Sequence, residues 1–137
     1  MTETRIVGID YGEKRVGIAM ADPLGIFAQP FGTYSPRDSI VKLEELHEKE
    51  GVRTIIIGWP LEQDGSEGPA TEAVNHFIQR LRNSLVNVEI VRWDERFTSE
   101  DAREQIRSGP APSMRKKGRG RIDMAAAGII LEEYLKS

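Results

Sequence analysis

The chain has 137 residues and a net charge of −3, with 39% hydrophobic and 30% charged residues. This balance is typical of a globular protein, and we expect residues 1–137 to form one domain. No apolar run reaches the roughly 18–20 residues of a membrane span, and the N-terminus lacks the pattern of a signal peptide. The absence of cysteine excludes disulfides and cysteine-based zinc sites. It also fits the reducing cytoplasm, where we expect the protein to be located.

Three strands open the predicted fold. Residues 4–10 and 15–21 are apolar runs, and the turn-forming residues 11–14 between them predict a β-hairpin. Residues 26–34 fit a third strand. Pro30 indicates that this strand lies at an edge or is interrupted, because proline cannot donate a hydrogen bond to a neighbouring strand.

Helices and strands then alternate. Residues 35–51 predict a helix, with a capping serine, a proline at the first helical position and a glycine at the end. Residues 52–57 predict a strand buried on both faces. Glycine and proline residues in 58–68 predict a loop, and the apolar stripe in 69–85 predicts a second helix.

The C-terminal part continues the alternation. Residues 88–93 predict a strand, and a capping pattern at Thr98 predicts a third helix to about Arg107. Residues 109–120 predict a loop and residues 122–135 a last helix. The order β-β-β-α-β-α-β-α-α predicts an α/β fold, a mixed sheet with helices on its faces.

Acidic residues lie at the ends of three apolar elements. Asp10 ends the first strand, Asp94 and Glu95 follow the strand at 88–93, and Asp123 lies in the first turn of the last helix. Each alone fits an ordinary role, such as stabilisation of the helix dipole. If strands 4–10 and 88–93 are parallel neighbours, however, their terminal carboxylates converge at one edge of the sheet, where ligands bind in such folds.

A cluster of carboxylates needs a cation, because like charges repel one another. Oxygen ligands and the absence of cysteine favour Mg²⁺ or Mn²⁺. Two such ions about 4 Å apart can activate a water and stabilise the leaving oxygen of a phosphodiester. The acidic residues therefore predict metal-dependent cleavage of nucleic acid.

Positive charge is concentrated next to Asp123. The segment 115–121 carries five positive charges and no negative one. Such a run is also typical of a solvated loop, but its position favours contact with phosphates. The predicted nucleic-acid-binding residues are Lys14, Arg15, Arg96, Lys116, Lys117, Arg119 and Arg121.

Other chemistry-bearing residues give weaker signals. The two histidines, His47 and His76, fall in predicted helices and are expected at the surface or its boundary, so we do not expect a histidine metal site. Trp59 and Trp93 flank strand ends and are expected to pack in the core. The loop at 58–68 lacks the pattern of a nucleotide phosphate loop, but its place after a strand suits an active-site loop.

Four blocks of sequence, in chain order, are similar to one family. The sequence from Ile9 to Ala19 resembles the opening motif of the YqgF/RuvX family of resolvases. The other matching blocks are Gly58–Leu61 with Asp64–Gly68, Asp94–Ser99, and Arg121–Asp123 with Ala125, Ala126, Ile130 and Leu131. The departures are Trp59 and Phe97, where the family commonly has leucine, and the arginine- and glycine-rich approach to Asp123.

The resemblance implies a ribonuclease H-like three-layer fold. Its sheet is mixed and five-stranded, in the order 3-2-1-4-5, with helices on both faces. The resemblance also implies Asp10, Glu95 and Asp123 as metal-binding catalytic acids, while the sequence does not decide between Glu95 and Asp94. The implied activity is hydrolysis of phosphodiester bonds, and we favour processing of the 5′ end of pre-16S rRNA in ribosome biogenesis.

Three alternatives remain at this point. A Holliday junction resolvase would act on branched DNA and would work as a dimer, since two symmetric cuts need two sites. A non-catalytic module would bind nucleic acid on the same fold. An ATPase of the actin and sugar-kinase type would need two such domains, for which this chain lacks room. We expect a monomer or a homodimer.

Overall fold

The structure, a computed structural model, describes residues 5–95 and 119–137, without the side chains of residues 119–124. The helix predicted at Thr98–Arg107 and the basic residues before Arg119 lie outside the described residues. The elements are β1 (Arg5–Tyr11), β2 (Val16–Ala21), β3 (Ala28–Tyr34), α1 (Pro36–Glu50), β4 (Val52–Trp59), α2 (Pro69–Ser84), β5 (Glu89–Asp94) and α5 (Arg119–Lys136).

The five strands form one mixed sheet in the order β3-β2-β1-β4-β5, as the family resemblance implied. β2 pairs with β1 and β3 in antiparallel fashion, whereas β4 pairs with β1 and β5 in parallel. β3 is an edge strand, and its register with β2 shifts between Ile18 and Ala19, opposite Gly32 and Pro30. The edge position expected from Pro30 is therefore confirmed.

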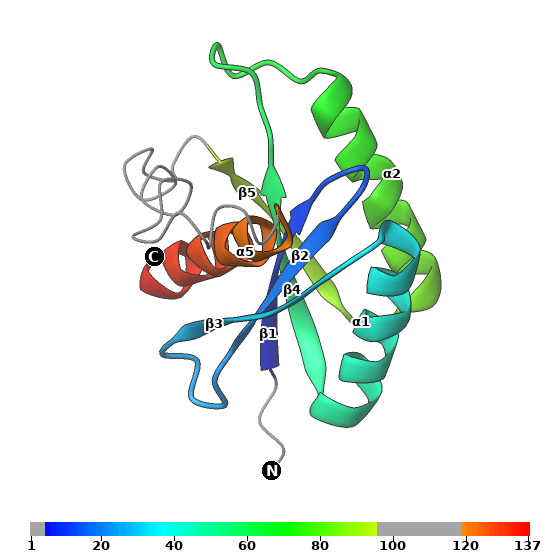
Figure 1. Ribbon diagram of the computed structural model, residues 1–137, viewed down its shortest axis with the longest axis vertical. Coiled ribbons are helices and arrows are strands. Elements are labelled where there is room, and N and C mark those ends of the chain that lie inside the picture. The colour runs from blue at the N-terminus through cyan, green and yellow to red at the C-terminus, as the bar shows by residue number, and fades with distance from the viewer. Residues whose placement is uncertain (1–4, 96–118) are drawn as a thin grey trace.

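The two strands that end in the predicted acids are not neighbours in the sheet. β1 and β5 do not pair, because β4 lies between them. The chain crosses from β3 to the far side of β1 through α1, and β5 then adds outside β4 (Figure 1). The carboxyl ends of β1, β4 and β5 still share one edge of the sheet, because these three strands are parallel.

Helices cover both faces of the sheet, giving three layers. α1 and α2 lie on one face and α5 crosses the other (Figure 1). The larger core joins α1 and α2 to the sheet, and a smaller core lies under α5. Among the described residues, no helix has the length and apolar character needed to cross a bilayer.

Strand alternation assigns residues to these two cores. On β1, Val7 and Ile9 belong to the α1–α2 core, while a β-carbon added at Gly8 would meet α5. On β4, Ile55 and Ile57 belong to the α1–α2 core and Ile56 to the α5 core. Successive residues of a strand point to opposite faces of the sheet. Any other residue of β1 or β4 can therefore be placed on the α1–α2 face or on the α5 face by its position in the strand.

The ends of α1 are capped as the sequence predicted, whereas the start of α5 and the end of β4 differ from the predicted bounds. Ser35 Oγ accepts a hydrogen bond from Asp38 N at 3.1 Å, and Gly51 ends α1 with a φ of 71°, a conformation that favours glycine. α5 begins at Arg119, so the end of the loop predicted at 109–120 is helical. β4 runs to Trp59 and so includes Gly58, which the sequence assigned to a loop, because pairing with β5 continues to that point.

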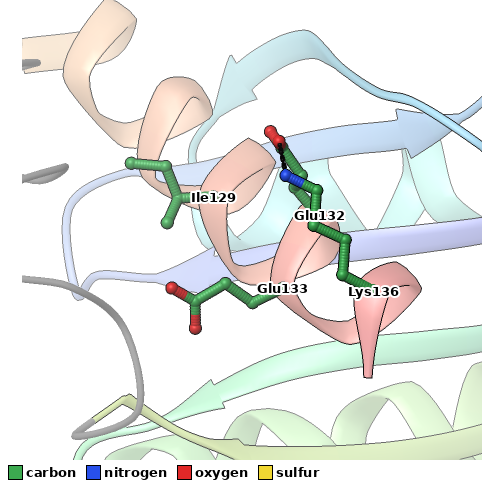
Figure 2. A pocket seen from close by; sticks show the side chains of 4 residues that line it. All are labelled: Ile129, Glu132, Glu133 and Lys136. Atoms are coloured by element: carbon green, nitrogen blue, oxygen red, sulfur yellow. Dashed lines mark hydrogen bonds and ion pairs between the residues drawn. The ribbon is translucent and has the colours of Figure 1, made fainter.

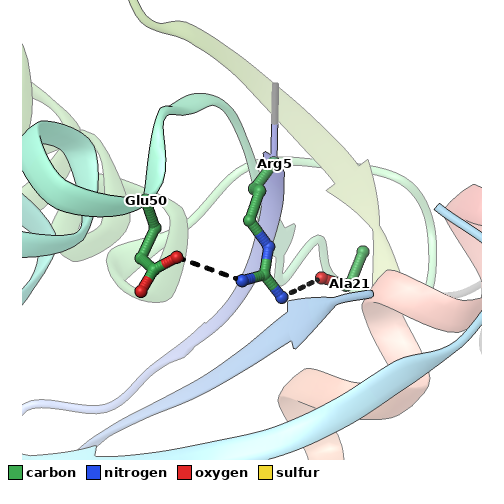
Figure 3. Close-up of polar contacts among 3 residues, drawn as sticks. All are labelled: Arg5, Ala21 and Glu50. Carbon is green, nitrogen blue, oxygen red and sulfur yellow. Dashed lines mark hydrogen bonds and ion pairs between the residues drawn. The ribbon is translucent and has the colours of Figure 1, made fainter. Parts of the chain in front are cut away.

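An arginine fixes the amino end of β1. Arg5 Nη1 lies 3.3 Å from Glu50 Oε2 at the end of α1, and Arg5 Nη2 donates to the carbonyl of Ala21 at 2.9 Å (Figure 3). This guanidinium therefore links β1 to α1 and to the end of β2. It lies at the amino end of β1, whereas Asp10 lies near the carboxyl end.

We predict that Gly8→Ala destabilises the protein. A β-carbon at Gly8 would lie 2.7 Å from Leu131 Cβ and 2.9 Å from the Ala127 carbonyl oxygen, so the backbone of α5 would have to move away from the sheet. Overpacking of this kind costs about 1–3 kcal/mol. Urea denaturation of both proteins would measure the loss, and an unchanged free energy of unfolding would contradict the close approach of α5 to β1.

Candidate active site

Asp10 lies at the carboxyl end of β1, one residue before the strand ends. It is half-buried, and it lies on the same face as Gly8 because the two residues are two positions apart on a strand. Its neighbour Tyr11 faces the opposite layer, where its ring lies 4.7 Å from that of Phe77 in α2. The Asp10 carboxylate therefore belongs to the α5 face.

Glu95 immediately follows β5 and lies on the same face. Its carboxylate extends over β4: a β-carbon added at Gly58 would lie 2.9 Å from Glu95 Oε1 and 2.9 Å from Ile130 Cδ1 of α5. Ile57 of β4 pairs with Ile9 of β1. The next residues along the two strands, Gly58 and Asp10, therefore lie side by side. Asp10 and Glu95 therefore flank β4 on one face, with a glycine between them.

Asp94 lies on the other face of the sheet. It pairs with Trp59 in the parallel register of β4 and β5, and paired residues of parallel strands share a face. Trp59 belongs to the core under α1 and α2. The structure thus separates the two acids that the sequence left as alternatives, and Glu95 is the one that shares a face with Asp10.

Asp123 lies within α5. Its side chain is outside the described residues, so its predicted approach to Asp10 and Glu95 stays a prediction. The helix that carries it packs on the face of Gly8 and Asp10, since Ala127 and Leu131 of α5 lie over Gly8. Among the described side chains, there is no group of three metal-ligating residues, and Asp123 is not one of those described.

The predicted phosphate-binding residues are described only in part. Lys14 is exposed and Arg15 half-buried, both in the turn that follows β1 and therefore at the edge that holds Asp10. Arg119 and Arg121 lie in the first turn of α5. Arg96, Lys116 and Lys117 lie outside the described residues.

The remaining aromatic and histidine residues behave as expected. Trp59 is buried, and the guanidinium of Arg92 lies 5.0 Å from its ring centroid. Trp93 packs edge-on against Tyr134 of α5, with ring centroids 5.9 Å apart. His47 is half-buried and His76 exposed. Both tryptophans therefore pack within the fold.

A small cavity lies elsewhere on α5. It has a volume of about 190 Å³ and is lined by Ile129, Glu132, Glu133 and Lys136 (Figure 2). Lys136 Nζ lies 2.7 Å from Glu132 Oε1, so its charge is already paired. The cavity involves none of the predicted site residues and belongs to the last turns of the helix.

The described part of the site fits a hard divalent cation. Two carboxylates on one face supply oxygen ligands, which Mg²⁺ and Mn²⁺ prefer. The missing side chain at Gly58 leaves space between them that a β-carbon would fill. Sequence reasoning placed Gly58 in a candidate active-site loop and in a family block, but it did not predict that Gly58 lies in a strand beside the carboxylates, although an isolated glycine in a strand is a known signal of close approach.

The sheet order and the helical layers on both faces define a ribonuclease H-like fold. Solved structures support the fold. Thermus thermophilus RuvC in complex with a Holliday junction substrate has a TM-score of 0.53 at 13% identity, covering 96% of this chain and 93% of that chain. Another structure of Thermus thermophilus RuvC gives a TM-score of 0.52 at 10% identity.

Sequence comparison gives the family. The family model RuvX, described as Holliday junction resolvase, matches residues 4–137. A protein of Salinibacter ruber named "Putative pre-16S rRNA nuclease" is 45% identical over 134 residues, covering 98% of this chain and 94% of the relative. A protein of the same name from Chlorobaculum tepidum is 35% identical over 133 residues, covering 97% and 94%. The chain belongs to the RuvX family, and thus to the nucleases that hydrolyse phosphodiester bonds.

Proposed function

We propose that the protein is a divalent-metal-dependent endonuclease, acting as one domain on structured nucleic acid, and that its substrate is the 5′ end of pre-16S rRNA. The observation that carries the proposal is the placement of Asp10 and Glu95 on one face, on either side of Gly58. The names of the relatives from Salinibacter ruber and Chlorobaculum tepidum support the choice of substrate. We expect the enzyme to work in the cytoplasm.

Asp10, Glu95 and Asp123 are the residues that would hold Mg²⁺ or Mn²⁺. Position 123 lies four and eight residues before Ala127 and Leu131, and positions four apart share a helix face. Ala127 and Leu131 lie over Gly8 of β1, two residues from Asp10. This spacing supports Asp123 as the third ligand.

The chain's own residues have distinct parts in the reaction. The bound metal would lower the pKa of a water and stabilise the leaving oxygen of the phosphodiester. Asp10, Glu95 and Asp123 would hold the metal, and the buried end of β4 beneath the carboxylates would exclude water on that side. Lys14, at the exposed turn after β1, contacts a flanking phosphate, and Arg15, Arg96, Lys116, Lys117, Arg119 and Arg121 extend that contact.

A cleavage assay with two substrates tests the proposal. Pre-16S rRNA and a four-way DNA junction are incubated with the protein, with Mg²⁺ and with a chelator. We expect metal-dependent cleavage at the 5′ side of the rRNA precursor, at a rate at least about tenfold above that on the junction, which corresponds to about 1.4 kcal/mol of discrimination.

The opposite preference would support a second candidate, a Holliday junction resolvase, which the description of the family favours. That enzyme would be a homodimer, so light scattering after gel filtration would give twice the mass of the chain. Binding that ignores the chelator, with no products from either substrate, would instead indicate a non-catalytic nucleic-acid-binding protein.

A further inference from the structure

Gly58 occupies a critical position on the central strand of the parallel part of the sheet. It lies at the carboxyl end of β4, with Trp93 of β5 as its register partner. A β-carbon there would lie 2.9 Å from Glu95 Oε1 and 3.1 Å from the Glu95 carboxyl carbon. Real β-carbons do not approach other atoms so closely, so any side chain at position 58 must displace the carboxylate.

Backbone conformation does not explain this glycine. Among the described residues, the glycines with positive φ are Gly25, Gly51 and Gly65, and Gly58 is not one of them. Its strand geometry is open to any residue. Gly58 is therefore explained by the space above the sheet, which the Glu95 carboxylate occupies and a side chain would fill.

We propose that Gly58 is a positioning residue: its missing side chain lets the Glu95 carboxylate reach across β4 toward Asp10. The inference rests on the proposed function, in which both acids hold the metal. The inference adds that Gly58 on β4, which has no side chain, sets the distance between Asp10 on β1 and Glu95 after β5.

The neighbours of Gly58 differ from those of Gly8. At Gly8 a β-carbon would meet the backbone of α5, whereas at Gly58 the three nearest atoms, among the described residues, belong to the ends of two side chains, Glu95 and Ile130. Such ends can rotate away at small cost to folding. An alanine at position 58 should therefore disturb the chemistry more than the fold.

The decisive variant is Gly58→Ala, measured beside the wild type in single-turnover cleavage of the same substrate. A carboxylate moved by up to about 1 Å costs up to about 10²-fold in rate. We expect kcat to fall about 10- to 10²-fold with KM nearly unchanged. We also expect the Mg²⁺ concentration for half-maximal rate to rise, and the Mg²⁺-induced increase in Tm of the nucleic-acid-free protein to shrink.

Gly128→Ala is the matched control. Gly128 is also a buried glycine, but among the described residues a β-carbon there would meet Ala19 Cβ alone, at an ordinary contact distance of 4.0 Å. This variant should cleave at the rate of the wild type and respond to Mg²⁺ as the wild type does. Equal losses in both glycine variants would overturn the inference.

A double variant separates the two contacts of Gly58. Gly58→Ala/Ile130→Val removes the Cδ1 atom that an alanine would strike, and leaves the conflict with Glu95. It should recover any stability lost in Gly58→Ala but not the rate or the Mg²⁺ response. Full recovery of cleavage would show that the effect passes through packing of α5, and would overturn the inference.

Asp10→Asn distinguishes failure of the inference from failure of the proposed function. If Asp10→Asn is inactive while Gly58→Ala keeps the rate and Mg²⁺ response of the wild type, the nuclease assignment stands and the role of Gly58 is wrong. If Asp10→Asn cleaves like the wild type, the proposed function itself fails.

Discussion

Replacing Asp10 by asparagine should lower the cleavage rate by about 10³-fold or more, which is about 4 kcal/mol in activation free energy. The amide is nearly the same size as the carboxylate but has no charge, so it cannot hold a divalent cation beside Glu95. Single-turnover cleavage of pre-16S rRNA in saturating Mg²⁺ measures the loss.

The fold should survive this substitution. Asp10 is half-buried near the end of β1, while the adjacent Ile9 and Tyr11 pack in the opposite layer and are unchanged. In chelator the variant should melt at or slightly above the temperature of the wild type, because it removes one of a set of repelling carboxylates. Added Mg²⁺ should raise the Tm of the wild type but not that of the variant, since stabilisation requires binding to the native state.

Asp94→Asn supplies the matched control. It makes the same chemical change at a carboxylate on the opposite face of the sheet, where Trp59 is its register partner. This variant should keep its Mg²⁺ response and cleave within a fewfold of the wild type. Full activity of Asp10→Asn would remove the basis for the nuclease assignment, and loss of Mg²⁺-dependent stabilisation in Asp94→Asn would place the metal on the wrong side of the sheet.

Most of the described fold could be predicted from sequence because its signals are local. The capping of α1 by Ser35 and Gly51, the apolar stripe of α2 and the apolar runs of the strands depend on neighbouring residues alone. The sheet order came from the resemblance to a family. Reasoning from the strand ends alone left the convergence of the acids conditional on the pairing of β1 and β5. Strand pairing depends on where the connections cross the sheet, and the end residues do not encode it.

The candidate site also has features that local sequence predicts and features that depend on strand pairing. The acids at element ends were found because a carboxylate after an apolar run is conspicuous. The choice between Asp94 and Glu95 required the register of β5 against β4, since consecutive residues differ only in the face to which they belong. Gly58 was assigned to a loop because Pro60, Gly65 and Gly68 follow it as breakers. Its pairing with β5 overrides that local preference.

Phe77→Ala should produce the largest loss of stability, about 3–5 kcal/mol, because it empties a space within the core. Phe77 is 1% exposed on α2, and its ring packs against Tyr11 at the end of β1. For a protein of this size the Tm should fall by roughly 10 °C. Denaturant unfolding and thermal melting give both quantities, and His76→Ala, at the exposed neighbouring position, should stay within about 0.5 kcal/mol of the wild type.

The same variant also tests how independent the two faces of the sheet are. The cavity left by Phe77→Ala opens under Tyr11 on the α2 side, whereas Asp10 faces α5, so cleavage measured well below the Tm should remain within a fewfold of the wild type. Asp10→Asn should do the reverse, keeping stability and losing cleavage. If Phe77→Ala instead loses activity in proportion to stability at low temperature, the end of β1 is held rigid from the α2 side, and the carboxylates depend on that core for their positions.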